Sequence, residues 1–286
     1  MTQSNIALIT DSTAALPDEI RQRYDVLIVP TMLHWGAQSY RDGVDISPQA
    51  FFERLKTDPV HPTTSAFSIG SAQEIYRQAA TGHASVLGLH ISSKLSGVYE
   101  IAQQARDLMP DLTVKIVDTR VTAMALGFVI QQVGEACEAG ASLDEAAALA
   151  QAMIPNAGIL LSPEVLTYLQ RGGRIGAAAA MVGGLLDLKP ILDLQDGMLK
   201  PLERVRSRKK ALARMVDVAV ERLTGKTKVR LGGVHANAED EARAVAQAAA
   251  ERLGSAVVQT TVCPVSPTVG AHIGPGTVGL CYTWGF

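Results

Sequence analysis

The chain has 286 residues and a mass of 30.3 kDa, which is enough for about two domains at roughly 100 to 200 residues each. Hydrophobic residues make up 47% of the chain and charged residues 19%, a balance that excludes an intrinsically disordered protein. The formal net charge of −2 provides no overall field for phosphate backbones, and this argues against a general nucleic-acid binder.

The first half of the chain alternates short apolar runs with helix-length amphipathic stretches. This alternation predicts a parallel sheet with helices on both faces, in a three-layer α/β/α domain. Asp11, Ser92 and Asp118 closely follow three of the predicted strands, and open α/β sheets bind ligands at the carboxyl ends of their strands. The predicted strands are residues 6–9, 26–29, 85–91 and 114–117, and the predicted helices are 18–23, 48–56, 96–108 and 122–139.

The second half has a mixed pattern. The dipeptide Asp196-Gly197 between apolar runs at 190–194 and 198–203 predicts a β-hairpin. We therefore expect an N-terminal domain at residues 1–155 and a two-layer α/β domain with a mixed sheet at 156–286, with segments free to cross between them and a cleft along their contact. Further strands are predicted at 159–162, 229–234, 256–262 and 277–283, and helices at 163–169, 176–186, 207–223 and 239–253.

Cysteine spacing and the N-terminus favour a cytoplasmic protein. Cys137, Cys263 and Cys281 are far apart and odd in number, so they form neither a disulfide framework nor a metal clamp. The N-terminus lacks the basic region of a signal peptide, and no apolar run reaches 18 residues, so we expect no stable membrane insertion. The six histidines have no metal-ligand spacing, and no metal site is predicted.

Four loops rich in hydroxyl groups and glycine lie at residues 10–13, 62–65, 92–97 and 270–276. Hydroxyls before a helix are the usual N-caps, and this structural role alone explains many of them. Ser96 lies where a strand-end loop enters a predicted helix, so its hydroxyl and the free N–H groups behind it suit a carboxylate or a phosphate. Because the loop lacks the glycine density of a phosphate cradle, a single carboxylate is the simpler ligand.

A series of short motifs, ordered along nearly the whole chain, resembles the DegV family. The resemblance implies two α/β domains with a long-chain fatty acid buried between them, and no cofactor. It also implies a partner, a dihydroxyacetone-kinase-like fatty acid kinase, to which such a non-catalytic protein presents the acyl carboxylate for acyl phosphate formation in phospholipid metabolism. The motifs are TDSTAALP (10–17), the spaced residues Gly36, Tyr40 and 42–46, PTTS (62–65), SSKLSG (92–97), VDT (117–119), LQRGGRI (169–175), LKPIL (188–192), DG (196–197), RVRSRKKA (204–211) and HIGPGTVGL (272–280).

The same resemblance implies a carboxylate site. It places the family's carboxylate-binding threonine on Thr64 and its serine on Ser96, although Ala66-Phe67 and Val98 depart from the usual neighbours of these residues. For Arg171 a surface ion pair is an equal alternative. The apolar segment 177–186 is core in any interpretation, and lining the lipid slot is a further hypothesis for it. Supporting head-group residues in the matching motifs are Ser65, Ser93, Gly97, Arg171 and His272.

One dense basic cluster stands in this slightly acidic chain. It is either a solvated helix start or a docking surface for an acidic kinase. Cations at a helix N-terminus oppose the helix dipole, so the second explanation deserves a test. The cluster consists of Arg204, Arg206, Arg208, Lys209 and Lys210.

Two other functions stay open from the residues alone. The first is a serine-dependent acyl hydrolase or transferase with Ser96 as nucleophile, His272 as base and Asp11 or Asp118 as the orienting acid. No local sequence marks Ser96 as activated. The second is a regulatory protein whose surface changes with the bound ligand, and the sequence does not separate it from a lipid carrier.

Overall fold

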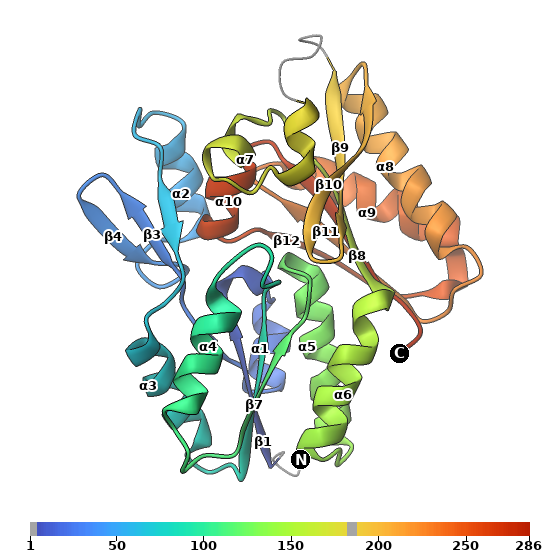
Figure 1. The fold of residues 1–286 in the computed structure, drawn as a ribbon. Coiled ribbons are helices and arrows are strands. Elements are labelled where there is room, and N and C mark those ends of the chain that lie inside the picture. Colours follow the sequence, from blue (N-terminus) through green and yellow to red (C-terminus); the bar gives the residue numbers. More distant parts are fainter. Residues whose placement is uncertain (1–4, 182–187) are drawn as a thin grey trace.

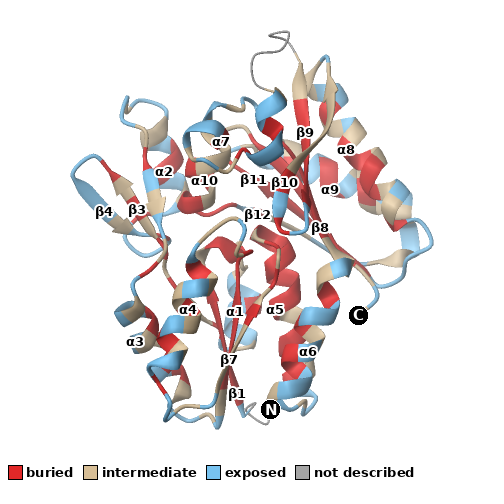
Figure 2. Ribbon diagram, in the orientation of Figure 1, coloured by how far each residue is buried: buried red, intermediate tan, exposed pale blue. Residues whose placement is uncertain are grey.

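The computed structural model describes residues 5–181 and 188–286. Its first domain is built on a four-stranded parallel sheet in the order β2-β1-β6-β7 (Figure 1). All six residues of β1 are buried, as expected of a strand covered on both faces, and Figure 2 shows the buried strands inside helices with exposed outer faces. The strands are β1 (Ile6–Asp11), β2 (Leu27–Val29), β6 (Ser85–His90) and β7 (Val114–Asp118).

Helices cover both faces of this sheet. One face carries α1 (Asp18–Arg23), α5 (Ala123–Glu138) and α6 (Leu143–Met153), and the other carries α3 (Ile69–Ala80) and α4 (Val98–Asp107). The predicted α/β/α domain is thereby confirmed. Helices α3 and α6 were absent from the sequence prediction.

A small antiparallel sheet projects beside the first domain, with strand order β4-β3-β5. Its strands are β3 (Met32–Trp35), β4 (Gln38–Arg41) and β5 (Thr63–Ser65). Helix α2 (Pro48–Leu55) packs against it through Phe51, whose ring meets Trp35 edge-on at 5.4 Å. The sequence did not predict this sheet, which carries Thr64 toward the second domain.

The second domain is a six-stranded mixed sheet in the order β10-β9-β8-β13-β11-β12, which confirms the second half of the predicted fold. Helices α8 (Arg208–Leu223) and α9 (Glu239–Leu253) cover one face, and the other face turns toward α5 and the first domain (Figure 1). The strands are β8 (Ala157–Ser162), β9 (Lys189–Gln195), β10 (Met198–Val205), β11 (Val229–His235), β12 (Val257–Pro264) and β13 (Val278–Thr283).

Two short helices complete the inner side of this domain, α7 (Thr167–Arg171) and α10 (Pro267–Ile273). The helix predicted at 163–169 was wrong in its bounds, because α7 begins at Thr167, with the Gln170 amide donating to the Leu166 carbonyl, and ends at Arg171. Of the predicted segment 176–186, Gly176–Met181 forms a 3₁₀ helix, and residues 182–186 lie outside the described residues.

Polar contacts join the two domains along α5. Arg230 on β11 donates to Glu135 at 2.8 Å, and Gln131 donates to Gln259 on β12 at 2.9 Å. At Gly232 the strand passes so close to α5 that a Cβ atom would lie 2.8 Å from the Met124 side chain. Within the described ranges, no helix has both the length and the apolar character needed to cross a bilayer.

Candidate functional site

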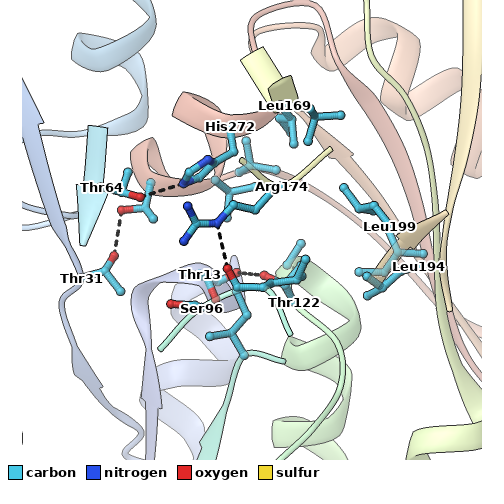
Figure 3. A pocket seen from close by; sticks show the side chains of 18 of the residues that line it. Thr13, Thr31, Thr64, Ser96, Thr122, Leu169, Arg174, Leu194, Leu199 and His272 are labelled. Atoms are coloured by element: carbon cyan, nitrogen blue, oxygen red, sulfur yellow. Dashed lines mark hydrogen bonds between the residues drawn. The ribbon is translucent and has the colours of Figure 1, made fainter. Parts of the chain in front are cut away.

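A cavity lies between the two domains and takes its walls from both. Its empty volume is about 980 Å³, including the space at its open mouth, which falls within the usual size of small-molecule sites. One end is lined by hydroxyl groups and two basic side chains, and the other by aliphatic side chains (Figure 3). The polar end comprises Thr13, Thr31, Thr64, Ser96, Thr122, Thr268, Arg174 and His272.

Most hydroxyls at the polar end are already engaged within the protein. Thr13 donates to Asp11 at 2.6 Å, Thr122 donates to the Thr13 carbonyl at 3.3 Å, and Thr31 and Thr268 pair at 2.8 Å. The Ser96 hydroxyl has no hydrogen-bond partner among residues 5–181 and 188–286. Ser96 is therefore the hydroxyl most free to bind a ligand.

Thr64 is held by His272, whose Nε2 lies 2.7 Å from the Thr64 Oγ1 (Figure 3). Burial, assisted by the charges of Arg174 and His61, lowers the pKa of His272 to about 4, so the ring is neutral at pH 7. Its Nδ1 is buried without a partner in the part of the chain that is described. An unpaired buried N–H costs more than an unused lone pair, so we assign the ring proton to Nε2. Thr64 then accepts from His272 and keeps its own proton for a ligand.

Arg174 is the cation of the cavity wall. Its Nε donates to the Leu95 carbonyl at 3.0 Å and its Nη1 to the Gly172 carbonyl at 2.7 Å. These two bonds hold the guanidinium between the polar loop and the end of α7, and its remaining N–H groups have no hydrogen-bond partner among the described residues, so they can bind an anion. Arg174 was not predicted from the sequence, where Arg171, the other arginine of the same LQRGGRI motif, was the candidate.

The far end of the cavity is apolar and belongs to the second domain. The inner face of the six-stranded sheet and α7 supply its side chains, and Leu194 and Leu199 lie on the side away from Thr64 in Figure 3. This end offers dispersion contacts and no hydrogen bonds, which suits a hydrocarbon. The apolar wall includes Ile159, Leu161, Leu169, Leu194, Leu199 and Val234.

The remaining predicted site residues divide into two groups. Ser65 and Gly97 line the cavity beside Thr64 and Ser96. Ser93 does not line it, because its hydroxyl donates to Asp118 at 2.5 Å and so fixes the loop. Arg171 is exposed and does not line the cavity. Burial, and after it the charge of Arg171, lowers the pKa of His61, which does not line the cavity either. Residues 177–181, the described part of the predicted lipid-lining segment, do not line it either.

The structure does not assemble the hydrolase triad. Asp11 is buried and bonded to His90 at 3.0 Å, and Asp118 binds Ser93 and Arg120. His272 faces Thr64, and its Nδ1 lacks the carboxylate that would orient a catalytic base. No group of three His, Cys, Asp or Glu side chains within the described residues is placed to hold a metal ion.

The basic cluster is divided by the fold. Arg208 is largely buried and pairs with Glu241 at 2.7 Å, while its guanidinium also donates to the Ser162 and Gly276 carbonyls. Arg204 donates to the Ala180 carbonyl. The exposed members at the start of α8 are Arg206, Lys209 and Lys210.

Fold and cavity together define a two-domain α/β protein with a cavity between its domains that is polar at one end and apolar at the other. The chain belongs to the DegV family, because the model of that family, described as an uncharacterised protein family, matches residues 5–284. A DegV domain-containing protein of Streptomyces coelicolor is 37% identical over 278 residues, which cover 96% of this chain and 97% of that protein. The resemblance read from the motifs is thus confirmed.

Solved structures of the family share the whole fold. A fatty acid-binding DegV family protein from Thermus thermophilus superposes with a TM-score of 0.91 at 32% identity, covering 98% of this chain and 99% of that one. DegV of Bacillus subtilis, described as a fatty acid-binding protein, superposes with a TM-score of 0.90 at 28% identity. The superposition covers 99% of this chain and 100% of that one. A stearic acid-binding protein from Eubacterium ventriosum superposes with a TM-score of 0.88 at 26% identity, and the superposition covers 98% of each chain.

Proposed function

We propose that this protein binds one long-chain fatty acid in the cavity between its domains. The carboxylate lies at the polar end, where Thr64, Ser96 and Arg174 donate hydrogen bonds to it, and the acyl chain extends toward Leu194 and Leu199. The observation that carries this proposal is the division of the cavity, with unused donors at one end and an aliphatic wall at the other.

The energies suit a fatty acid. Burying a 16-carbon chain gains on the order of 12 kcal/mol at about 0.8 kcal/mol per CH₂, before the costs of association and ordering. A buried carboxylate without donors or a cation would raise its pKa and weaken binding. Arg174 supplies the charge and the two hydroxyls supply neutral donors, so the head group enters in its ionised form.

Family members support the same ligand class. The Thermus thermophilus and Bacillus subtilis proteins are described as fatty acid-binding, and the Eubacterium ventriosum protein holds stearic acid. All three share this fold over nearly the whole chain. We extend their ligand class to this chain on that ground together with the cavity's own chemistry.

We further propose that the protein is a non-catalytic carrier in the cytoplasm that presents the carboxylate to a fatty acid kinase. Ser65 and Gly97 line the head-group end and are themselves exposed, so a carboxylate bound there lies next to the surface. A carrier of this kind leaves the phosphoryl transfer to its partner. The exposed cations Arg206, Lys209 and Lys210 are candidates for steering that partner.

The test of the proposed function is the ligand itself. Protein purified from a bacterial host should release about one long-chain fatty acid per chain on organic extraction, measured by mass spectrometry, since an apolar slot fills from membrane lipids. Delipidated protein should take up palmitate at the same ratio. A protein that carries no lipid and binds none when offered would refute the assignment.

A further inference from the structure

The tip of the β9–β10 hairpin reaches from the second domain to the first. Its two-residue turn, Asp196 and Gly197, has positive φ at both positions, 51° and 79°, as a type I′ turn requires. The Gly197 carbonyl accepts a 2.8 Å hydrogen bond from the hydroxyl of Ser92, which is completely buried. Neither residue belongs to the head-group site described above.

The contact between Ser92 and Gly197 leaves no room for a side chain at position 197. A Cβ atom at Gly197 would lie 2.3 Å from the Ser92 Oγ and 3.2 Å from the Arg120 side chain. Ser92 has little room to move away, because its Oγ also accepts from the Lys94 amide at 3.2 Å and its own amide donates to the Val121 carbonyl at 3.0 Å. The position of the turn relative to the first domain is therefore fixed by Ser92.

On the hairpin side, the turn controls part of the apolar wall. Leu194 and Leu199 are directly paired across β9 and β10, and both line the cavity. They lie two or three residues from the turn, about 7 to 10 Å along the strands. Because a hairpin with a two-residue turn moves largely as one piece, a shift of the tip shifts this leucine pair.

On the loop side, Ser92 also fixes the head-group end. Its carbonyl accepts from the Ser96 amide at 3.2 Å and from the Leu95 amide at 2.9 Å. The Leu95 carbonyl in turn holds the Nε of Arg174. One residue thus contacts both the loop that bears Ser96 and the hairpin that bears Leu194 and Leu199.

We propose that Ser92 is a positioning residue that, through Gly197, sets the spacing between the head-group loop and the Leu194–Leu199 wall. That spacing determines how well a long acyl chain fits. This inference rests on the proposed function, since it concerns the same cavity. It requires that disturbing the contact penalises long acyl chains more than short ones, whereas a merely structural contact would affect every ligand alike.

The experiment compares Gly197→Ala with Gly225→Ala in delipidated protein. Gly225 has nearly the same φ, 78°, but open space around its Cβ position, so it reproduces the backbone strain without the collision. Binding of palmitate and of octanoate is measured by calorimetry. We expect Gly197→Ala to weaken palmitate binding by about tenfold or more and octanoate binding by less than about threefold, while Gly225→Ala changes both by less than about twofold.

Ser92→Ala supplies a second, milder variant. It removes the donor but leaves space for the turn, so palmitate affinity should fall about threefold to tenfold. Combined with Gly197→Ala it should recover part of the lost palmitate affinity, because the nearest colliding atom is gone. If Gly197→Ala fails to fold, as judged by its melting temperature, Ser92→Ala provides the test. The inference then requires that Ser92→Ala weaken palmitate binding by a larger factor than octanoate binding.

Two results would overturn the inference. The first is an equal loss of palmitate and octanoate affinity in the Gly197→Ala and Ser92→Ala variants. The second is a palmitate affinity in both variants that matches that of the Gly225→Ala control. Both leave the proposed function intact, because wild-type protein still binds palmitate. Wild-type protein without palmitate binding would instead refute the proposed function, and the inference with it.

Discussion

At the polar end of the cavity, a single proton on His272 decides what Thr64 offers to a ligand. With the proton on Nε2, the Thr64 hydroxyl accepts from the ring and keeps its own proton to donate to a ligand. Gly172 makes this arrangement possible, since a Cβ there would lie 2.1 Å from the His272 Nδ1. A carboxylate, which only accepts, is the ligand that such a hydroxyl suits best.

Removing either hydroxyl donor should weaken binding of the head group. We expect Thr64→Ala and Ser96→Ala each to cost about 1 to 3 kcal/mol of palmitate binding free energy, because each takes a donor from a buried charge. Thr63 is exposed on the same strand and does not line the cavity, so Thr63→Ala is the matched control. Wild-type affinity in the Thr64→Ala, Ser96→Ala double variant would place the carboxylate elsewhere.

The two arginines of the LQRGGRI motif should behave differently. Arg174→Gln removes the cation from the cavity wall and is expected to weaken palmitate binding by about 1.5 to 3 kcal/mol. Arg171→Gln, which changes an exposed side chain outside the lining, should leave the affinity within about twofold. Calorimetry on delipidated variants checks both, and a larger effect from Arg171→Gln would restore that residue to the head-group site.

Stability should depend on pH through His272. Its pKa is lowered to about 4 in the folded protein, so between about pH 6.5 and 4 the unfolded chain binds more protons at this residue and acid favours unfolding. From pH 7 to 4.5, delipidated wild-type protein should lose about 1 to 3 kcal/mol more unfolding free energy than His272→Gln. His61 and His235 also have lowered pKa values, so the difference between the two proteins is the measured quantity. Parallel urea-denaturation profiles would show that His272 does not titrate in this way.

At the scale of elements, the start of α8 is the surface to test for a partner. Reversing Arg206 and Lys209 to Glu should slow acyl phosphate formation by a fatty acid kinase at low salt and flatten its salt dependence, with palmitate affinity unchanged, because exposed charges act mainly on association rate. Lys226 and Lys228 are exposed at the other end of α8. Reversing those two changes the net charge equally and serves as the control. Equal rates for both variants would make the cluster a solvated helix start.

The sequence predicted the elements whose stability is local. Strand β1 is predicted by its continuous apolar run, and helix α8 is predicted by its amphipathic periodicity. Strands β4 and β5 are three or four polar, mostly exposed residues that exist because they pair with β3. No periodicity marks such strands, so the sheet that carries Thr64 was missed.

The sequence predicted only those site residues that lie in recognisable motifs. Thr64, Ser96 and His272 lie in matched motifs and do line the cavity. Arg174 and Arg171 flank the same two glycines, and only the turn of the chain after α7 decides which of them faces inward. The contact of Ser92 with Gly197 joins residues that are 105 positions apart in the sequence. Local sequence patterns do not predict contacts between residues so far apart.

For the molecule as a whole, the ion pair between Arg230 and Glu135 links β11 to α5. Arg230→Met should lower the free energy of unfolding by about 1 to 3 kcal/mol, because it leaves the half-buried Glu135 carboxylate without its cation and with only the Gln131 side-chain amide as a hydrogen-bond partner among those described. Arg23 pairs with Glu138 on the same helix with its side chain 55% exposed, and Arg23→Met should cost less than about 1 kcal/mol. Urea denaturation measures both, and equal losses would show that the interdomain pair contributes no more than a surface one.

The close approach of α5 to Gly232 makes the two domains poor candidates for separate expression. A fragment ending at residue 155 would bare the side of α5 that bears Met124 and Phe128, both completely buried in the intact chain. The complementary fragment would bare the aliphatic inner face of its sheet, including Leu161 and Leu194. Apolar patches of this kind drive association or precipitation. The domains are thus distinct in architecture but not modular, and swapping one of them between family members would require transplanting the matching surface of the other.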